Sequence, residues 1–495
     1  MKKFLLALLP VALLLISCGK DNPDNPEPKE KSSACSLVSF QFKSDAGAGM
    51  VGTANAVFAT IQSVPMAFIT VPEGVDLHSL KPTFSISDKA TLTAGGKAVE
   101  SGKTAIDFSS PIELKVTAEN GSSYKKCLLV ARNGDATIDN EVYAIMKEYD
   151  IPGIGIATTK KEVATYSAGY GFANMDSSPR VQCRPDMLFR LASMSKAQTA
   201  LCIMTLVEEG KLSLDDYVFA PGTGILADKY PGEHGNNVDL IKIRHLLTHT
   251  SGWKYATTDG VDPIFTGDGR FYGKSLTERV AYMVKTSTSV EPGSLPSSYY
   301  NLGFCVLGQV IEKVSGVSYE EFLRSVVAKA GVTDMWVAKT AKADRRANEC
   351  VYYPQGASTA YGNDMTVVGA CGAVIASPLE LMKLLSAEDY GTVVPDILTK
   401  ESLDQMYTNY TVPGGKAGYG FGWRIEHNTL TNWASYHGGN ISGTATIWVR
   451  GKNGVNGVLL CNSRSQKDGF DTALYLSLNA IMERVNLLYY TIRYT

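Results

Sequence analysis

Apolar and polar residues alternate through much of the region from residue 36 to residue 135. Residues 38–42 and 112–116 both show this period of two, which predicts half-buried β-strands. The second run leads to Glu119-Asn120-Gly121, a turn signal typical of a β-hairpin. We therefore predict a small all-β sandwich over residues 36–135.

Beyond residue 136 the pattern changes to longer amphipathic segments mixed with glycine-bounded strands. Residues 151–171 and 442–463 each predict a strand hairpin, helices are predicted between them, and another helix is predicted over residues 469–485. Strands from both ends of this region would form one antiparallel sheet with helices packed on it. The predicted fold class of residues 136–495 is therefore α/β of the α+β type, an antiparallel sheet flanked by helices with a helical subdomain.

The first residues have the layout of an export signal. Lys2 and Lys3 precede an apolar run over residues 4–16, and Leu15-Ile16-Ser17-Cys18 resembles the lipobox of bacterial lipoproteins. This resemblance implies a signal peptide over residues 1–17, lipidation of Cys18, and a polar flexible linker over residues 18–35. We expect an exported lipoprotein anchored in the outer membrane, facing the periplasm or the surface. The alternative is an ordinary secretory signal that ends near a cysteine.

The sandwich region carries a second resemblance. The phrases ITVPEGVDLHSLKPTFSIS and IELKVTAENGSSYKK resemble the immunoglobulin-like modules that stand between lipid anchor and working domain in many Bacteroidetes surface lipoproteins. The resemblance covers residues 36–135 and implies an Ig-like sandwich.

Composition excludes some classes of partner. The chain of 495 residues has 47 Lys and Arg against 49 Asp and Glu, so there is no basic surplus and we exclude nucleic acid. Nine cysteines are scattered without CxxC spacing, and His245 and His249 have no evident third ligand, so we predict no metal and no cofactor. A disulfide between Cys35 and Cys127 is an option that the sequence leaves open.

The first candidate for a catalytic motif is a Ser-x-x-Lys pattern. The chain has several copies of this pattern, and most of them do not stand at the start of a predicted helix. Ser193 alone precedes an amphipathic helix, predicted over residues 194–209 and ended by Gly210. Residues three apart share a helix face, so Lys196 can direct its amine at the Ser193 hydroxyl. The alternative is that Ser193 only caps this helix. The other copies begin at Ser17, Ser122, Ser123 and Ser251.

Two further motifs follow in the chain. Tyr299-Tyr300-Asn301 stands between a Pro-Gly turn and a predicted amphipathic helix, a frame that the same pattern at Tyr361 and Tyr407 lacks. His437-Gly438-Gly439 enters a predicted strand, where glycine lets the backbone approach a ligand closely. Tyr299 could instead be a core tyrosine, and His437 could be a packed histidine.

In this order the three motifs resemble the serine β-lactamase and penicillin-binding-protein superfamily, and more closely the class C β-lactamase-like esterases and D-amino-acid peptidases. Supporting landmarks are IRHLLTHTSGW from Ile243, GACGAVIASPLELMKLL from Gly369 and GYGFGW from Gly418. The resemblance spans residues 136–495. The chain departs from the family pattern where His437-Gly438 replaces Lys-Thr.

The resemblance implies a role for each matching residue. Ser193 would be the acylated nucleophile, Lys196 its proton partner and Tyr299 the second acid/base group. The substrate-binding residues would be Asn301, His437, Gly438, Gly439 and Asn440, with the backbone N–H groups of Ser193 and Asn440 forming the oxyanion hole. If His437 touches substrate, activity should rise through its titration near neutral pH.

The sequence therefore predicts a metal-free serine acyl hydrolase that acts on small-molecule or peptide esters or amides, with peptidoglycan fragments as one source of substrate. Loss of the Lys-Thr pair weakens the charge that binds a β-lactam carboxylate, which favours esterase or D-peptide hydrolase activity. A true β-lactamase or D,D-carboxypeptidase is the alternative within the class. An inert, lipid-anchored binding or adhesion protein is the alternative from another class.

Overall fold

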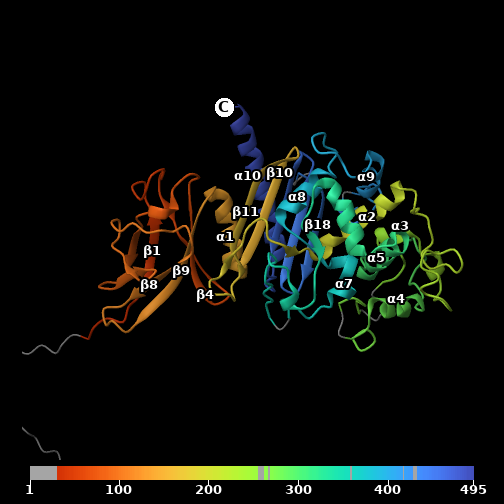
Figure 1. Ribbon diagram of the computed structural model, residues 1–495, viewed down its shortest axis with the longest axis horizontal. Helices are drawn as coiled ribbons and strands as arrows, with labels where there is room; N and C mark the ends of the chain where they lie inside the picture. Colours follow the sequence, from red (N-terminus) through yellow and green to blue (C-terminus); the bar gives the residue numbers. More distant parts are fainter. Residues whose placement is uncertain are drawn as a thin grey trace, which may run out of the picture.

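The structure is a computed structural model that describes residues 30–254, 261–265, 268–356, 359–415, 417–426 and 432–494. It has an all-β module formed by the first part of the chain and a larger part in which helices surround a sheet (Figure 1). The predicted signal peptide, Cys18 and the linker up to residue 29 lie outside the described residues. None of the helices in the described ranges combines the length and hydropathy needed to cross a membrane.

The all-β module consists of two sheets that share one core. The larger sheet has the order β3 (Val57–Ile61), β4 (Val64–Val71), β9 (Tyr124–Asn133), β8 (Ile112–Thr117), β6 (Thr91–Ala94), β7 (Lys97–Ala98). The smaller has the order β2 (Ala54–Asn55), β1 (Leu37–Phe42), β5 (Thr83–Ile86). Phe40 and Phe42 of β1 pack in a common cluster with Ile69 of β4 and Leu114 of β8. The predicted β-rich sandwich is confirmed, and the boundaries at residues 36 and 135 stay predictions.

The central sheet of the larger part joins both ends of that part, as predicted. Its order is β12 (Val181–Gln182), β11 (Val163–Asn174), β10 (Gly153–Lys160), β20 (Val455–Cys461), β19 (Thr444–Gly451), β18 (Trp433–Ile441), β17 (Arg424–Glu426), β16 (Ala417–Tyr419), and neighbouring strands are antiparallel. Every residue of β10 is buried, because this strand pairs on both edges and is covered on both faces. The predicted fold class is therefore confirmed.

Helices cover the two faces of this sheet in separate groups. Helices α1 (Ala136–Tyr149) and α10 (Phe470–Tyr494) pack on one face, and α8 (Pro378–Ser386) packs on the other (Figure 1). The remaining helices lie on the α8 side and share one apolar core with the small sheet of β13 (Phe189–Arg190), β15 (Val374–Ala376) and β14 (Met335–Val337). They are α2 (Ser195–Glu208), α3 (Ile243–Leu247), α4 (Leu276–Val284), α5 (Asn301–Ser315), α6 (Tyr319–Val327), α7 (Met365–Gly372) and α9 (Lys400–Met406).

Helix α1 also joins the two parts of the molecule. It begins after Asp135, whose side chain accepts the backbone N–H groups of Thr137 and Ile138, an N-cap of the ordinary kind. On one side it packs against β3 and β4 of the module, and on the other against β10 and α10. One apolar cluster therefore continues from the module through α1 into the central sheet.

The disulfide between Cys35 and Cys127 is absent, and both residues are free thiols. Cys35 is packed into the core of the module, whereas Cys127 faces a cavity at one end of it. The two thiols therefore lie in different environments of the same module, and they do not form the bond that the sequence left open.

Candidate active site

Ser193 lies in a short, strained turn that is held from two sides. The turn is the 3-10 segment η2 (Ala192–Met194), and Ala192 has a φ of 50°, which residues other than glycine rarely adopt. Leu191 donates its backbone N–H to the Val374 carbonyl at 2.9 Å and accepts the Thr446 hydroxyl at 2.8 Å. Strand β15 therefore holds the turn on one side and β19 on the other.

The Ser193 hydroxyl does not cap a helix. Met194 is the N-cap of α2 and Leu191 is the N-cap of η2, and neither position has a side-chain capping bond. Instead, Ser193 Oγ accepts a hydrogen bond from Lys196 Nζ at 3.1 Å. The alternative of an N-cap serine is therefore wrong, and the hydroxyl faces a cavity.

Lys196 is completely buried beside Ser193. Its ammonium also donates to the Cys371 carbonyl at 2.8 Å, and it lies 4.9 Å from the centre of the Tyr299 ring. Burial by itself lowers the pKa of this ammonium, but the attraction and hydrogen bond of Tyr299 outweigh burial, so the pKa of Lys196 is raised. Lys196 is therefore a cation at neutral pH, and its ammonium is directed at the Ser193 hydroxyl.

The fold sends the two adjacent tyrosines to different places. Tyr299 lines the cavity that contains Ser193. Tyr300 is buried and its hydroxyl lies 3.9 Å from the Met283 sulfur. Tyr361, from another copy of the Tyr-x-Asn pattern, packs beside Arg190 instead. Of these three tyrosines, only Tyr299 is placed beside both Ser193 and Lys196.

Asn301 begins helix α5 and turns its amide towards a loop residue. Its Nδ2 donates to Asp262 Oδ2 at 2.8 Å, and its Oδ1 has no hydrogen-bond partner within the described part of the chain. Asn301 does not line the cavity that contains Ser193. The predicted contact between Asn301 and substrate therefore stays a prediction.

Residues 437–440 form an open edge of β18 beside the Ser193 turn. Strand β17 pairs with Ser435 and Tyr436 only, so this edge of β18 is free from His437 onward. Gly439 is necessary for the close approach, because a Cβ there would lie 2.1 Å from the Leu191 oxygen and 2.2 Å from Thr446 Oγ1. The glycine therefore brings the strand edge against the residue that precedes the turn.

The strand register decides the direction of the Asn440 backbone. A two-residue turn joins β18 to β19, and Asn440 pairs with Ala445, one step back from the pair that closes the turn. The closing pair of such a hairpin is hydrogen-bonded, and antiparallel pairs alternate, so the Asn440 pair is not. The Asn440 N–H therefore points away from β19, on the side of the cavity.

Both ring nitrogens of His437 are engaged within the protein. Nδ1 donates to the Gly438 carbonyl at 2.7 Å, so Nε2 accepts the Tyr419 hydroxyl at 3.0 Å. Burial, with the charges of Lys196 and Arg424, lowers the pKa of His437 well below its ordinary value. The expected rise of activity through a His437 titration near neutral pH is therefore wrong, because the ring stays neutral there.

Most of the predicted residues line one cavity of about 330 Å³, and Lys196 reaches it through its bond to Ser193 Oγ. Ser193, Tyr299 and residues 437–440 all line it. Arg424, which the sequence reasoning missed, also lies in its wall, with the guanidinium 5.8 Å from the centre of the Tyr299 ring. Its position directly after the GYGFGW landmark is the signal that could have marked it.

A second cavity of about 390 Å³ adjoins the first and shares Tyr299, Arg424 and Tyr436 with it. His249, interpreted as structural from the sequence, lines this second cavity with its ring centre 4.3 Å from that of Tyr299. Its Nδ1 accepts the Tyr300 N–H at 3.2 Å, and burial lowers its pKa. His249 therefore supports Tyr299 as a neutral ring. Across the described residues, no three His, Cys, Asp or Glu side chains are grouped to hold a metal.

Comparison with known families gives a match to each part of the chain. The family model described as Beta-lactamase matches residues 138–480, which include the whole cavity around Ser193. A second model, described as SGBP, N-terminal, matches residues 51–127 of the all-β module.

Individual relatives match the larger part. A penicillin-binding protein of Bacillus subtilis, PbpX, is 26% identical over 302 residues, 60% of this chain and 68% of its own. Esterase EstB of Burkholderia gladioli is 30% identical over 200 residues, 39% of this chain and only 48% of its own length. The structure of D-amino acid amidase from Ochrobactrum anthropi SV3 with L-phenylalanine has a TM-score of 0.55 at 22% identity and covers 70% of this chain and 99% of its own. The last likeness concerns the fold alone.

Proposed function

The chain belongs to the β-lactamase family of serine hydrolases, and from that premise we propose that residues 136–495 form an acyl hydrolase whose nucleophile is Ser193. The observation that carries the proposal is the 3.1 Å bond from Lys196 Nζ to Ser193 Oγ, in a cavity that Tyr299 also lines. We propose esters and amides as substrates, and the similarity to esterase EstB supports the esters.

The proposed acylation uses the charges around Ser193. The Lys196 cation donates to Ser193 Oγ and also interacts with Tyr299, which in this scheme reacts as the phenolate. As Ser193 Oγ bonds to the acyl carbon, Tyr299 takes the hydroxyl proton and passes it to the leaving group. The N–H groups of Ser193 and Asn440 would stabilise the oxyanion, and losing one such donor typically costs about 10²–10³ in rate.

Deacylation reverses the same proton path. A water molecule attacks the acyl carbon as Tyr299 accepts its proton, and the proton then returns to Ser193 Oγ as the acyl group leaves. His437 makes no proton transfer in this scheme, because Gly438 and Tyr419 occupy both of its nitrogens. It instead fixes the edge of β18 that carries the Asn440 N–H.

The test of the proposal is turnover by the wild type and Ser193→Ala of p-nitrophenyl esters, D-phenylalanine amide and a chromogenic cephalosporin. Loss of all turnover in Ser193→Ala, with an acyl adduct on Ser193 in the wild type, is the expected result. The relative rates choose between esterase, D-amidase and β-lactamase. An unmodified Ser193 and no turnover would favour the inert binding protein.

A second candidate, a D,D-carboxypeptidase, is favoured by Arg424. Its guanidinium lies in the wall of the cavity with Ser193 and supplies the positive charge that His437 lacks. A substrate carboxylate near the scissile bond would bind it. Arg424→Gln should raise KM at least tenfold for a peptide ending in D-Ala-D-Ala and leave p-nitrophenyl acetate hydrolysis within twofold. If Arg424→Gln affected both substrates equally, Arg424 would not bind a substrate carboxylate.

We also propose that the protein is an exported lipoprotein. The sequence Leu15-Ile16-Ser17-Cys18 and the family that matches the all-β module support this proposal. Metabolic labelling with palmitate should mark the wild type and not Cys18→Ala. Labelling of both, or of neither, would contradict the anchor.

A further inference from the structure

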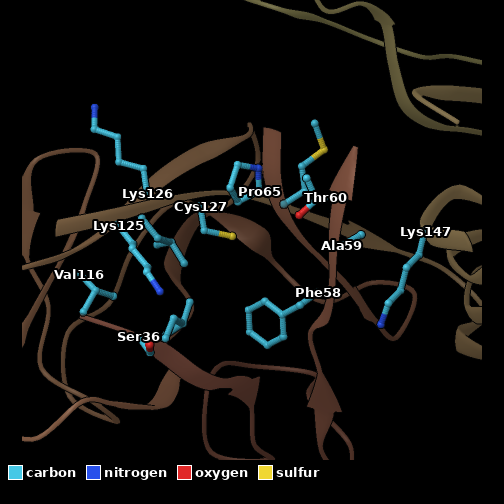
Figure 2. Close-up of a pocket in the computed structure, with 13 residues that line it drawn as sticks. Ser36, Phe58, Ala59, Thr60, Pro65, Val116, Lys125, Lys126, Cys127 and Lys147 are labelled. Carbon is cyan, nitrogen blue, oxygen red and sulfur yellow. The ribbon is translucent and has the colours of Figure 1, made fainter. Parts of the chain in front are cut away.

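A cavity of about 660 Å³ lies in the all-β module, away from Ser193 (Figure 2). It opens between the two sheets. Leu37 of the smaller sheet and Phe58, Leu114 and Val116 of the larger sheet line it, and these side chains belong to the module's apolar core or pack against it. The cavity is therefore an apolar pocket that continues into the core.

The topology of the module explains why this space is open. Three strands face six, so the smaller sheet covers only part of the larger one. Strand β4 first pairs with β9 at Leu128, so residues 124–127 of β9 pair only with β8. The pairing of β1 with β5 also shifts between Leu37 and Ser39. Both irregularities occur at the cavity, where they leave the core uncovered.

The cavity is bordered by lysines that differ in their partners. Lys126 pairs with Glu113 at 3.0 Å, and Figure 2 shows its side chain directed away from the cavity. Lys125 is directed towards the cavity and Lys147 of α1 lies at its opposite side, and within the described residues neither has an ion-pair partner. An apolar interior with positive charge at its border is complementary to a molecule that is apolar along its length and anionic at one end.

We propose that this cavity binds a single-chain carboxylate amphiphile, such as a medium-chain fatty acid, with the chain between the sheets and the carboxylate at Lys125. The concave shape favours a discrete molecule over a membrane surface, and the volume lies within the range of pockets for small ligands. This site is independent of the proposed hydrolysis at Ser193.

Calorimetric titration of the full chain with dodecanoate tests the proposal, with dodecyltrimethylammonium as the probe of opposite charge. We expect dodecanoate to bind and the cation to bind at least tenfold more weakly. Lys125→Gln should weaken dodecanoate binding about tenfold or more, since it removes the charged contact of the carboxylate. Lys126→Gln is the matched control and should change affinity less than twofold, because that amine is paired outside the cavity.

Cys127 provides a second measurement at the site itself. Its thiol lines the cavity, and among the eight described cysteines it alone is not buried. Burial of part of the side chain raises the pKa of Cys127 to about 11, so alkylation by N-ethylmaleimide is measured at pH 9. Bound dodecanoate should slow alkylation at Cys127, and unchanged alkylation would place binding elsewhere.

Three results would overturn the proposal. The first is no binding of dodecanoate by wild type whose thermal melt and ester hydrolysis show a folded chain. The second is equal binding of dodecanoate and the cation, which would mean that the lysines do not select charge. The third is binding only of anionic phospholipid vesicles or an acidic peptide, which would identify a macromolecular partner instead.

Discussion

At the scale of single residues, the proposed catalysis depends on which of two adjacent tyrosines reaches Ser193. Tyr299 and Tyr300 are adjacent in the sequence, but Tyr299 lines the cavity whereas Tyr300 is buried in the core. The Lys196 ammonium, 4.9 Å from the Tyr299 ring centre, then couples the phenol to the Ser193 hydroxyl. In the proposed mechanism only Tyr299 takes part in proton transfer, so a variant of Tyr300 is the matched control.

Tyr299→Phe should reduce kcat by about 10²–10⁴, the usual contribution of a general acid or base. Tyr300→Phe should keep kcat within threefold, because Tyr300 is buried in the core and does not line the cavity of Ser193. Steady-state kinetics on one p-nitrophenyl ester checks both variants. A comparable loss in the two would exclude Tyr299 from proton transfer.

Glu388 is a second residue whose behaviour is set by its buried environment. Burial, with the nearby Asp396 carboxylate, raises the pKa of Glu388 to about 8. The unfolded chain loses this proton near pH 4.5, so between pH 4.5 and 8 the folded state holds one proton more and its stability falls as pH rises.

Glu388→Gln removes this titration, so its stability relative to wild type should increase by roughly 1 kcal/mol per pH unit between pH 5 and 8. Urea unfolding of both proteins at several pH values measures the difference. Asp389 and Asp396 titrate in both proteins, so their contributions cancel. Parallel stability profiles for the two proteins would show that Glu388 is already ionised in the folded state.

At the scale of elements, the site depends on how closely β18 approaches the turn at η2. Thr446 of β19 holds the Leu191 carbonyl, and Gly439 of β18 has room for no side chain beside the same oxygen. This contact aligns the Ser193 turn with the Asn440 N–H. A small change in the strand should therefore have a large effect on the rate.

Gly439→Ala should lower kcat at least a hundredfold, because its Cβ would meet a backbone oxygen and push the two elements apart. We expect a loss of about 1–3 kcal/mol in stability from the same overpacking. Gly269→Ala is the control, because a Cβ there meets nothing within 4 Å. Normal kinetics in Gly439→Ala would mean that the strand edge does not position the oxyanion donor.

At the scale of the whole molecule, a buried carboxylate connects the module to the hydrolase sheet. Asp139 of α1 accepts the hydroxyl of Thr70 from β4 at 2.7 Å and that of Tyr170 from β11 at 2.6 Å. Arg132 of β9 pairs with the same carboxylate at 3.2 Å. With the apolar packing on both sides of α1, these bonds fix the module on the hydrolase domain.

Asp139→Ala should cost about 3–5 kcal/mol, because it leaves Arg132 and the buried hydroxyls without their common partner. Calorimetry should show one unfolding transition in the wild type and a separate, earlier transition in the variant. Glu100→Gln is the control, since its pair with Lys103 is exposed and such pairs contribute about 0–1 kcal/mol. Unchanged coupling in Asp139→Ala would assign the junction to the apolar contacts alone.

The sequence by itself determined the features that depend on local pattern. Period-two alternation indicated the strands of the module, and glycine-bounded apolar runs at both ends of the larger part indicated its single antiparallel sheet. Three short motifs in order resemble those of the β-lactamase family, and this resemblance indicated Ser193, Lys196 and Tyr299 as candidates for catalysis. These constraints act within a few residues, so the sequence carries them.

Only the tertiary structure decided what depends on residues distant in the chain. It placed Arg424 in the wall of the cavity, turned the Asn301 amide to Asp262, and gave His437 two internal partners and a lowered pKa. It also left the end of the module's sandwich open, because β4 starts short of β9. The pKa of a side chain, its burial and the size of a cavity all depend on residues that only folding brings together. No local sequence pattern can therefore encode them.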